Sequence, residues 1–533
     1  MKKEQIIIDD ELSYLYMRTK DRFVIATHNN DGEILAAASV DDVDEVRDYI
    51  RDTKSLLDGK YYGRNLPIKK VPLEELEAWF SLLERKNLDE SEVNEKDEKE
   101  KSDIAKKLNF ILTEAANKRC SDIHIEIYKD VTKVLFRIDG LRSRHTAIDG
   151  AEEGLRIARN IFYFSAEQKD HDFTHELTNN GNIREFLEVD GTRRETLWRV
   201  AWTPSDSEGG KLTFRWLNRH KKIPTLEQLR WERGHIEQAE RFRDGDSGLM
   251  IVAGKTGSGK TTAIAAIIDT IGEELSIHTF EDPPEFKLTN AIQTHLKPNK
   301  VHEKTGELLD QDYYGRATLR HDPDIEWHGE VRTPSAALQI SRKGDTGQKV
   351  LTTVHTSFSY TVPSTLIHQM NLPPSLVALP GLVKLIVYQA LVRQLCPHCK
   401  LDHTEWSESA SDKDQAYVIE TAKYIEEREG LKYQNIMNSL HFANPKGCKH
   451  CIAGVYDRLP LVEMIVLDDE DREYISECRW VAWKKHLYDK GFKDIKSHGI
   501  VRLMRGEVDL FSVESRIGHI KAVDSTALYG SLL

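Results

Sequence analysis

The chain has 533 residues, a formal net charge of −13 and 31% charged residues. This length predicts three or four domains, and the acidic balance argues against a nucleic-acid partner. The best membrane-span candidate, Leu379–Leu395, is interrupted by polar residues, and the apolar run after Met1 is too short for a signal peptide. We therefore expect a cytoplasmic protein.

Residues 1–86 mix strand-like runs, such as Phe23–Ala26 and Ile34–Ala38, with a helical stretch at Val43–Leu57. They predict a small α/β module without a chemical motif. Residues 87–103 are rich in Asp, Glu and Lys and have almost no apolar side chains. Burial cannot offset their ordering entropy, so this segment is predicted to be a charged linker or a solvated helix.

Residues 104–225 are predicted to form a second N-terminal domain of the α+β type. Apolar residues recur at helical spacing from Ile104 to Leu112. Four later segments have strand character: Ser121–Glu126, Val134–Gly140, Glu195–Trp202 and Lys211–Trp216. Arg199 and Arg215 lie on the last two of these strands. From the residues alone, they could equally be ordinary surface arginines or ligands of an anion.

The clearest motif, G-x-x-x-x-G-K-[ST], begins after the apolar run Leu249–Ala253 and leads into the helical stretch Thr262–Ile268. Its glycines let backbone N–H groups wrap a polyphosphate, its lysine reaches the β- and γ-phosphates, and its hydroxyl holds Mg²⁺. The predicted ATP-binding residues are Gly254, Lys255, Thr256, Gly257, Ser258, Gly259, Lys260, Thr261 and Thr262. Thr261 is the predicted Mg²⁺ ligand.

Further candidate residues follow predicted strands of an ATPase domain spanning residues 226–393. Glu281 and Asp282 come after the strand Ser276–Phe280, where carboxylates can meet Mg²⁺ or the attacking water. Glu330 follows an unusually polar strand and is a candidate to orient that water. His355 ends the strand Lys349–Val354, where it is either structural or a sensor of the γ-phosphate.

Four motifs now occur in a fixed order: the phosphate loop, the acidic segment Thr279–Glu285, the segment Leu319–Arg332 and the segment Thr346–Thr356. Together they resemble the ATPases of type II secretion and type IV pilus assembly. In that family the last three are called the Asp box, Walker B and His box. The resemblance covers roughly residues 104–465.

This resemblance implies a RecA-like ATPase that forms a homohexamer at the cytoplasmic face of the inner membrane. It also implies a platform protein as partner and assembly of pilin or pseudopilin subunits. Glu330 would activate water, Glu281 and Asp282 would lie near the metal and nucleophile, and Arg199 and Arg215 would reach the phosphates.

Three departures indicate a divergent branch of that family. Gln348 stands where the first His-box histidine is expected, so only His355 can take that role. Glu326-Trp327-His328 replaces an apolar run, and Thr333 stands where the family usually has aspartate.

Residues 394–466 carry two C-x-x-C pairs, which favour a tetrahedral Zn²⁺ site. Their cysteines are Cys396, Cys399, Cys448 and Cys451. The gap of residues 400–447 is longer than the roughly 15–20 residues usual in a zinc ribbon, so a redox dithiol and unliganded thiols stay open as alternatives. The family resemblance favours zinc and an assembly motor over a retraction motor.

Residues 467–533 have amphipathic spacing and predict a C-terminal helical region, with Trp480 and Trp483 in its core. Cys120 and Cys478 are predicted to be buried without a metal. The predicted function is an assembly motor with ATP, Mg²⁺ and Zn²⁺. A retraction or DNA-uptake motor and a catalytically impaired, nucleotide-binding adaptor are the alternatives.

Overall fold

The computed structural model describes residues 23–28, 31–37, 68–71, 95–167, 169, 173–206, 209–219, 222–302, 304–522 and 525–530. The chain divides into two units, residues 1–107 and 108–533. In the first, β1 (Phe23–His28) runs antiparallel to β2 (Asp31–Ala37), which runs parallel to β3 (Ile68–Val71). The predicted helix at Val43–Leu57 lies outside the described residues.

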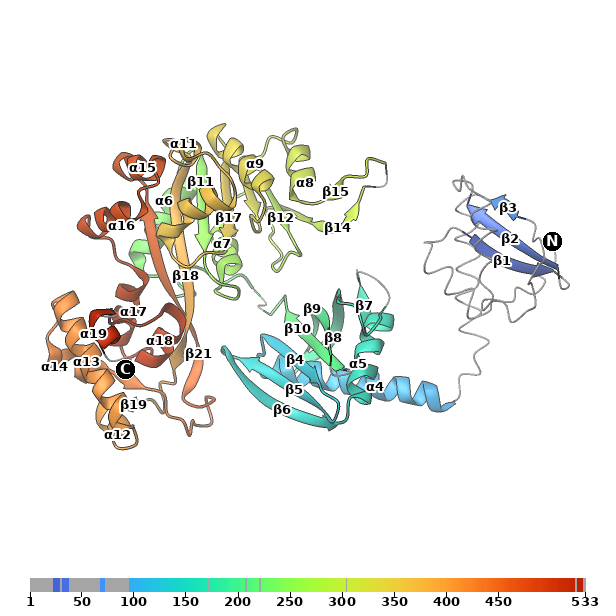
Figure 1. Ribbon diagram of the computed structural model, residues 1–533, viewed down its shortest axis with the longest axis horizontal. Helices are drawn as coiled ribbons and strands as arrows, with labels where there is room; N and C mark the ends of the chain where they lie inside the picture. Colours follow the sequence, from blue (N-terminus) through green and yellow to red (C-terminus); the bar gives the residue numbers. More distant parts are fainter. Residues whose placement is uncertain are drawn as a thin grey trace. The chain divides into compact units, whose positions relative to one another are not determined.

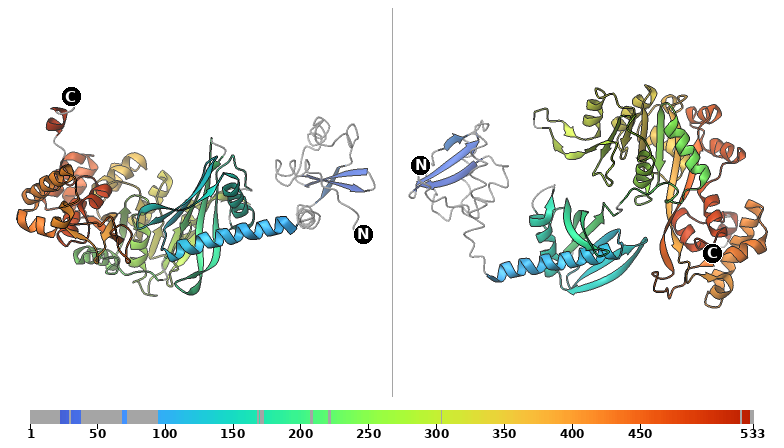
Figure 2. Two further views of the ribbon diagram at one scale, coloured as in Figure 1. Left: turned by 90° about the horizontal axis from the view of Figure 1, so that it is seen from below. Right: turned by 180° about the vertical axis from the view of Figure 1, so that it is seen from behind.

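Helix α4 (Glu95–Asn117) begins inside the segment predicted to be a charged linker or a solvated helix. Its last turns bury Leu108, Leu112 and Ala115. The side-chain amide of Asn117 donates to the carbonyl of Glu188, which holds this helix end against the second sheet (Figure 2). The domain limits predicted from the sequence remain predictions.

Among the described residues, seven antiparallel strands form the second sheet, in the order β6-β5-β4-β10-β9-β8-β7. Their bounds are β4 (Asp122–Ile127), β5 (Val131–Ile138), β6 (Leu141–Asp149), β7 (Ala166–Glu167), β8 (Asn179–Val189), β9 (Thr192–Ser205) and β10 (Gly209–Trp216). Helix α5 (Glu152–Asn160) packs on β4, and a π-helical turn (Ile161–Ser165) follows it. Asp139 and Gly140 both have positive φ, as the predicted tight hairpin turn requires.

A third sheet contains the phosphate loop and has the order β13-β12-β16-β17-β11-β18-β21 in the described part of the chain (Figure 1). The strands are parallel except for the β18–β21 pair. Their bounds are β11 (Gly248–Ala253), β12 (Ile277–Glu281), β13 (Ile292–His295), β16 (Ile325–His328), β17 (Lys349–Val354), β18 (Val383–Leu395) and β21 (Val455–Val466). This mixed α/β architecture confirms the predicted fold class.

Helices cover both faces of this sheet. They are α6 (Arg233–Asp244), α7 (Lys260–Ile268), α8 (Gln311–Thr318), α9 (Pro334–Asp345), α10 (Val362–Ser364) and α11 (Pro374–Val377). A 3₁₀ turn (Ser359–Thr361) and a π-helical turn (Thr365–Gln369) flank α10. A small hairpin, β14 (Lys297–Val301) with β15 (Leu308–Leu309), precedes α8.

The polar strand β16 is a genuine central strand, between β12 and β17, and all four of its residues are buried. Ile325 and Trp327 pack in the core with α7. On the other face, the Glu326 carboxylate accepts from Lys343 Nζ of α9 at 2.6 Å and lies 2.7 Å from His328 Nε2. An ion pair therefore replaces the apolar contacts usual for a buried parallel strand.

The C-terminal elements lie between and after the long, antiparallel strands β18 and β21 in the chain (Figure 1). Between them lie β19 (Leu401–Asp402), α12 (His403–Ser407), α13 (Asp412–Glu429), α14 (Tyr433–Ser439) and β20 (His441–Phe442). After them come α15 (Asp469–Ser476), α16 (Trp480–Asp489), α17 (Ile495–Met504), α18 (Leu510–Ile517) and α19 (Ser525–Gly530).

The predicted burial of two tryptophans and two cysteines is met fully by one residue of each pair and only in part by the other. Trp483 is fully buried in the core and Trp480 packs beside it. Cys120 is buried as predicted, whereas Cys478 is only half-buried. Of the helices in the described ranges, none combines the length and apolar character that a membrane crossing needs.

Candidate phosphate-binding and catalytic site

The phosphate loop joins the buried strand β11 to helix α7. Gly254, Gly257 and Gly259 all have positive φ, which L side chains rarely adopt. A Cβ added at Gly254 would lie 2.4 Å from the carbonyl of Gln389. The glycines of the motif are thus required by the backbone path, and the loop ends at the N-terminus of α7, where N–H groups and the helix dipole favour an anion.

Lys260, the first residue of α7, is buried at the centre of this loop. Its ammonium donates to the carbonyls of Gly254 at 2.9 Å and Lys255 at 3.2 Å. Burial lowers the pKa of Lys260 to about 8, although the carboxylates of Glu330 and Glu285 partly oppose the shift. The cation is therefore held in place, next to acidic groups, where the motif predicts it should reach phosphates.

Gln389 on β18 stabilises the loop and had no signal in the sequence. Its amide nitrogen donates to the carbonyl of Ser258 at 2.7 Å, and its amide oxygen accepts from the indole of Trp231 at 2.9 Å. The residue lies 131 positions from Ser258. Only the pairing of β11 with β18 brings it to the loop.

Glu330 and His355 lie in contact beyond neighbouring strands. His355 Nε2 is 3.2 Å from Glu330 Oε1, and the Arg332 guanidinium donates to Glu330 Oε2 at 2.8 Å. Burial raises the pKa of Glu330, but Arg332, His355 and Lys260 outweigh it and bring the pKa below its usual value. Burial, with Lys260, lowers the pKa of His355. The arrangement therefore favours an ionised carboxylate beside a neutral imidazole.

Glu281 and Asp282 are adjacent in sequence but differ in environment. Glu281 is buried, and one of its carboxylate oxygens accepts from Thr279 at 2.6 Å and from Gln293 at 3.0 Å. Its other oxygen has no hydrogen-bond partner among the described residues, and burial raises the pKa of this group. Asp282 is exposed and lies 3.3 Å from the guanidinium of Arg199.

The phosphate loop opens into a cavity of about 620 Å³ that Arg215 also lines. Arg215 Nε lies 2.9 Å from the buried carboxylate of Asp122 on β4. Arg199, by contrast, lines a separate hollow beside Asp282. The structure thus brings one of the two predicted arginines to the loop's cavity, and the catalytic roles of both remain predictions.

Additional charged groups line the same cavity and were not singled out from the sequence. Glu285 lies among Arg215, Arg199 and Lys260, and burial raises its pKa. Arg137, Arg219 and Arg458 also face the cavity. Glu285 belongs to the acidic segment named above, so its proximity to the phosphates could have been expected, whereas the arginines come from separate strands and loops.

The four predicted zinc ligands converge. Their sulfur atoms all lie within 4.8 Å of one another, with Cys396 and Cys448 3.7 Å apart and Cys399 and Cys451 3.5 Å apart. The backbone N–H of Cys448 donates to Cys451 Sγ at 3.2 Å, a contact that stabilises a thiolate. Four sulfur donors at this spacing fit a tetrahedral Zn²⁺ ion.

Comparison with known proteins gives consistent matches. The family described as type II/IV secretion system protein matches residues 97–515. The type IV pilus assembly ATPase PilB of Pseudomonas aeruginosa is 25% identical over 413 residues, which are 77% of this chain and 67% of the relative. The type II secretion system protein E of Klebsiella pneumoniae is 28% identical over 378 residues, 70% of this chain and 68% of the relative.

A solved structure shares the fold. The ATPase DotB of Legionella pneumophila superposes with a TM-score of 0.52 at 18% identity, and the match covers 76% of this chain and 93% of DotB.

Proposed function

Because this chain is an ATPase of the type II/IV secretion system protein family, we propose that it is a motor that drives assembly of pilin or pseudopilin subunits. The observation that carries the proposal is the convergence of Lys260, Glu330 and His355 at one edge of a parallel sheet. Ligands of such sheets bind beyond the carboxyl ends of the strands.

In this proposal the loop N–H groups and Lys260 bind the phosphates of ATP. Thr261 would hold Mg²⁺, and that ion would supply neutralisation of part of the phosphate charge. Glu330 orients the attacking water and accepts its proton, which suits a carboxylate whose pKa is low enough to be ionised at neutral pH. His355 positions Glu330 through their 3.2 Å contact.

Arg215 is the proposed link between the second sheet and the nucleotide. A planar cation aimed at the transferring phosphoryl group stabilises charge in the transition state. To do so, Arg215 must exchange its Asp122 partner for the phosphates. Arg199 would make the corresponding exchange from Asp282.

We further propose that six copies form a ring on the cytoplasmic face of the inner membrane, where nucleotide-driven motion acts on a platform protein. The names of the relatives support a role in pilus assembly or secretion, and the four-cysteine cluster supports assembly over retraction. Deleting the gene should abolish filaments or secreted substrate, counted by electron microscopy and by proteomics of the medium. Excess filaments in the deletion strain would instead indicate retraction.

Two substitutions test the catalytic assignment. Lys260→Ala should lose nucleotide binding and turnover, because the loop carbonyls and phosphates then lack their cation. Glu330→Gln should keep ATP affinity within a few-fold but lower phosphate release by about 10²–10⁴-fold, since the proton acceptor is lost. The exposed Glu273→Gln is a matched control.

Normal phosphate release by Glu330→Gln would contradict the assignment of Glu330. Absence of turnover in the unsubstituted chain, with ATP binding intact, would favour the nucleotide-binding adaptor.

A further inference from the structure

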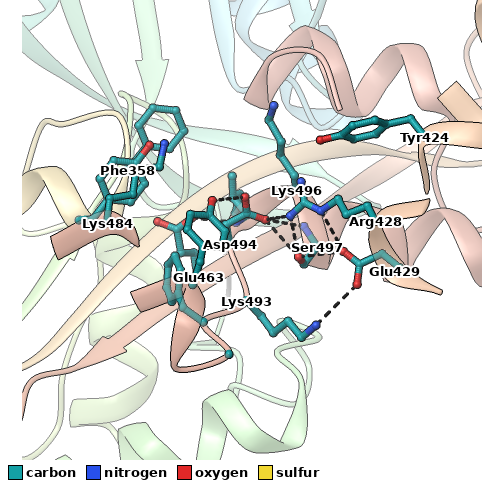
Figure 3. A pocket seen from close by; sticks show the side chains of 15 residues that line it. Phe358, Tyr424, Arg428, Glu429, Glu463, Lys484, Lys493, Asp494, Lys496 and Ser497 are labelled. Carbon is teal, nitrogen blue, oxygen red and sulfur yellow. Dashed lines mark hydrogen bonds and ion pairs between the residues drawn. The ribbon is translucent and has the colours of Figure 1, made fainter. Parts of the chain in front are cut away.

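A second cavity, of about 530 Å³, lies among the C-terminal helices and shares no lining residue with the phosphate-loop cavity. Figure 3 shows its lining side chains. Its walls come from α13, α16, the start of α17, strand β21 and the turn at Phe358–Tyr360. This volume is in the range of small-molecule sites. The cavity is thus assembled from segments far apart in the sequence.

The acidic groups of this cavity are already satisfied within the protein. Glu463 is fully buried and accepts from the backbone N–H groups of Ser359 and Ile495, both at 2.7 Å. Asp494 accepts from Arg428 at 2.6 Å and from Tyr488 at 2.7 Å. These carboxylates therefore hold the walls together and are not left to bind a cation.

Glu429, the third acidic side chain of the cavity, also has basic partners. It accepts from Arg428 at 3.0 Å and lies 3.6 Å from Lys493 Nζ. Two of the cavity's four basic side chains, Arg428 and Lys493, are thereby neutralised by acids of the cavity itself.

Lys484 and Lys496 are the basic groups that remain. In the part of the chain that the structure describes, neither ammonium forms an ion pair, and Figure 3 draws no interaction from either. Both side chains are half-buried. Burial lowers the pKa of Lys496, and Arg428 and Lys484 add to the shift, although the carboxylates of Asp494 and Glu514 oppose it. An anion between the two ammoniums would relieve this unfavourable environment.

An aromatic surface lies beside these lysines. The rings of Phe358 and Tyr360 stack with centroids 5.1 Å apart and planes 7° apart, and Lys484 Nζ lies 4.8 Å from the Tyr360 centroid. Tyr424 and Phe492 form other parts of the wall. Such a surface favours a planar ring over a bare anion.

We propose that this cavity is a second ligand site, which binds a phosphate-bearing molecule with a planar ring, of the mononucleotide class. Lys484 and Lys496 hold the phosphate, and the Phe358–Tyr360 surface holds the ring. The ligand then lies against the turn that follows His355, three positions before Phe358 in the sequence. Occupation of the site should therefore alter the position of His355 and the rate of hydrolysis.

The test uses the full chain with its phosphate loop saturated by a non-hydrolysable ATP analogue, and labelled GMP and AMP as probes in equilibrium dialysis. We expect about one additional mononucleotide per chain and at least tenfold weaker binding of inorganic phosphate. The Lys484→Ala/Lys496→Ala variant should bind the mononucleotide at least tenfold more weakly while keeping its affinity for the ATP analogue. Lys485→Ala, on the same helix but outside the cavity, should behave like the unsubstituted chain.

The site is refuted if no mononucleotide binds beyond the ATP analogue, or if the double variant binds as well as the control. Inorganic phosphate that binds as tightly as GMP would overturn the part played by the aromatic surface. An ATPase rate unchanged at saturating GMP would overturn the link to His355. Because the binding readout needs no hydrolysis, its result is independent of the proposed motor function.

Discussion

Lys260 must bind phosphate as a cation, yet its environment favours the neutral amine. Burial brings its pKa to about 8, well below the usual value of a lysine. Phosphates bind the ammonium and not the neutral amine, so a nucleotide raises this pKa when it binds. The lysine of the loop is therefore almost fully protonated only well below pH 8, and above pH 8 the loop must take up a proton to bind ATP.

We predict that the Kd for ATP is nearly constant from pH 7 to 7.5 and rises above pH 8, approaching about tenfold per pH unit. Fluorescence titration with a labelled ATP analogue measures this. Lys260→Arg is the matched control, because a guanidinium stays protonated over this range and should give a flat profile. A flat profile in the unsubstituted chain would contradict the assigned role of the Lys260 charge.

At the scale of elements, strand β16 depends on a partner from helix α9. Lys343 is 2% exposed and Glu326 fully buried, and Thr318 of α8 also donates to Glu326, at 3.1 Å. A buried pair of this kind contributes little net stability, because desolvation offsets the attraction. Loss of one partner is costly, since the other charge is then buried alone.

Lys343→Met should therefore lower the free energy of unfolding by roughly 3–5 kcal/mol, measured by urea titration. The double variant Glu326→Ile/Lys343→Met should recover most of that loss, because both charges are removed together. The neighbouring, exposed Arg342→Met is the control and should change stability by less than about 0.5 kcal/mol. Equal effects of Lys343→Met and Arg342→Met would show that the pair does not support β16.

The four-cysteine cluster also acts between elements, because it joins the end of β18 to the start of β21. The purified chain should contain one zinc ion per molecule by mass spectrometry of the metal content. Cys396→Ser and Cys448→Ser should each lose that zinc and unfold at a lower temperature. Cys478→Ser, outside the cluster, should keep it, and zinc retained without Cys396 and Cys448 would contradict the site.

At the scale of the whole molecule, the cavity at the phosphate loop is lined by two different sheets. The loop comes from the parallel sheet, and Arg215 comes from β10 of the antiparallel sheet. A change in the nucleotide can therefore act on both sheets through one residue. This is the physical link from hydrolysis to motion in the proposed motor.

Arg215→Ala should lower phosphate release by about 10³-fold, as expected for an arginine that stabilises the transferring phosphoryl group. The Kd for ATP should change by less than about tenfold, because the loop and Lys260 remain. Lys211→Ala, on the same strand, is the control. If Arg215→Ala leaves phosphate release unchanged, Arg215 serves only to pair with Asp122.

Much of this architecture could be predicted from the sequence. The strands around the phosphate loop, the hairpin at Asp139-Gly140 and the two C-x-x-C turns all follow from local patterns. A turn glycine, a C-x-x-C pair or a short apolar run predicts nearly the same local structure wherever it occurs in a sequence. These features depend on residues close in the chain.

Other features could not be predicted, because they depend on residues that only the fold brings together. The polar strand β16 is explained by Lys343, and the loop is held by Gln389 from 131 positions away. The partner of Arg215 and the lysine and aromatic surface of the C-terminal cavity are likewise set by packing. The sequence by itself determined the phosphate loop, the order of the motifs and the class of fold. Only the tertiary structure decided how the buried charges are compensated and which are left for a ligand, because a charge is stabilised by its neighbours in space.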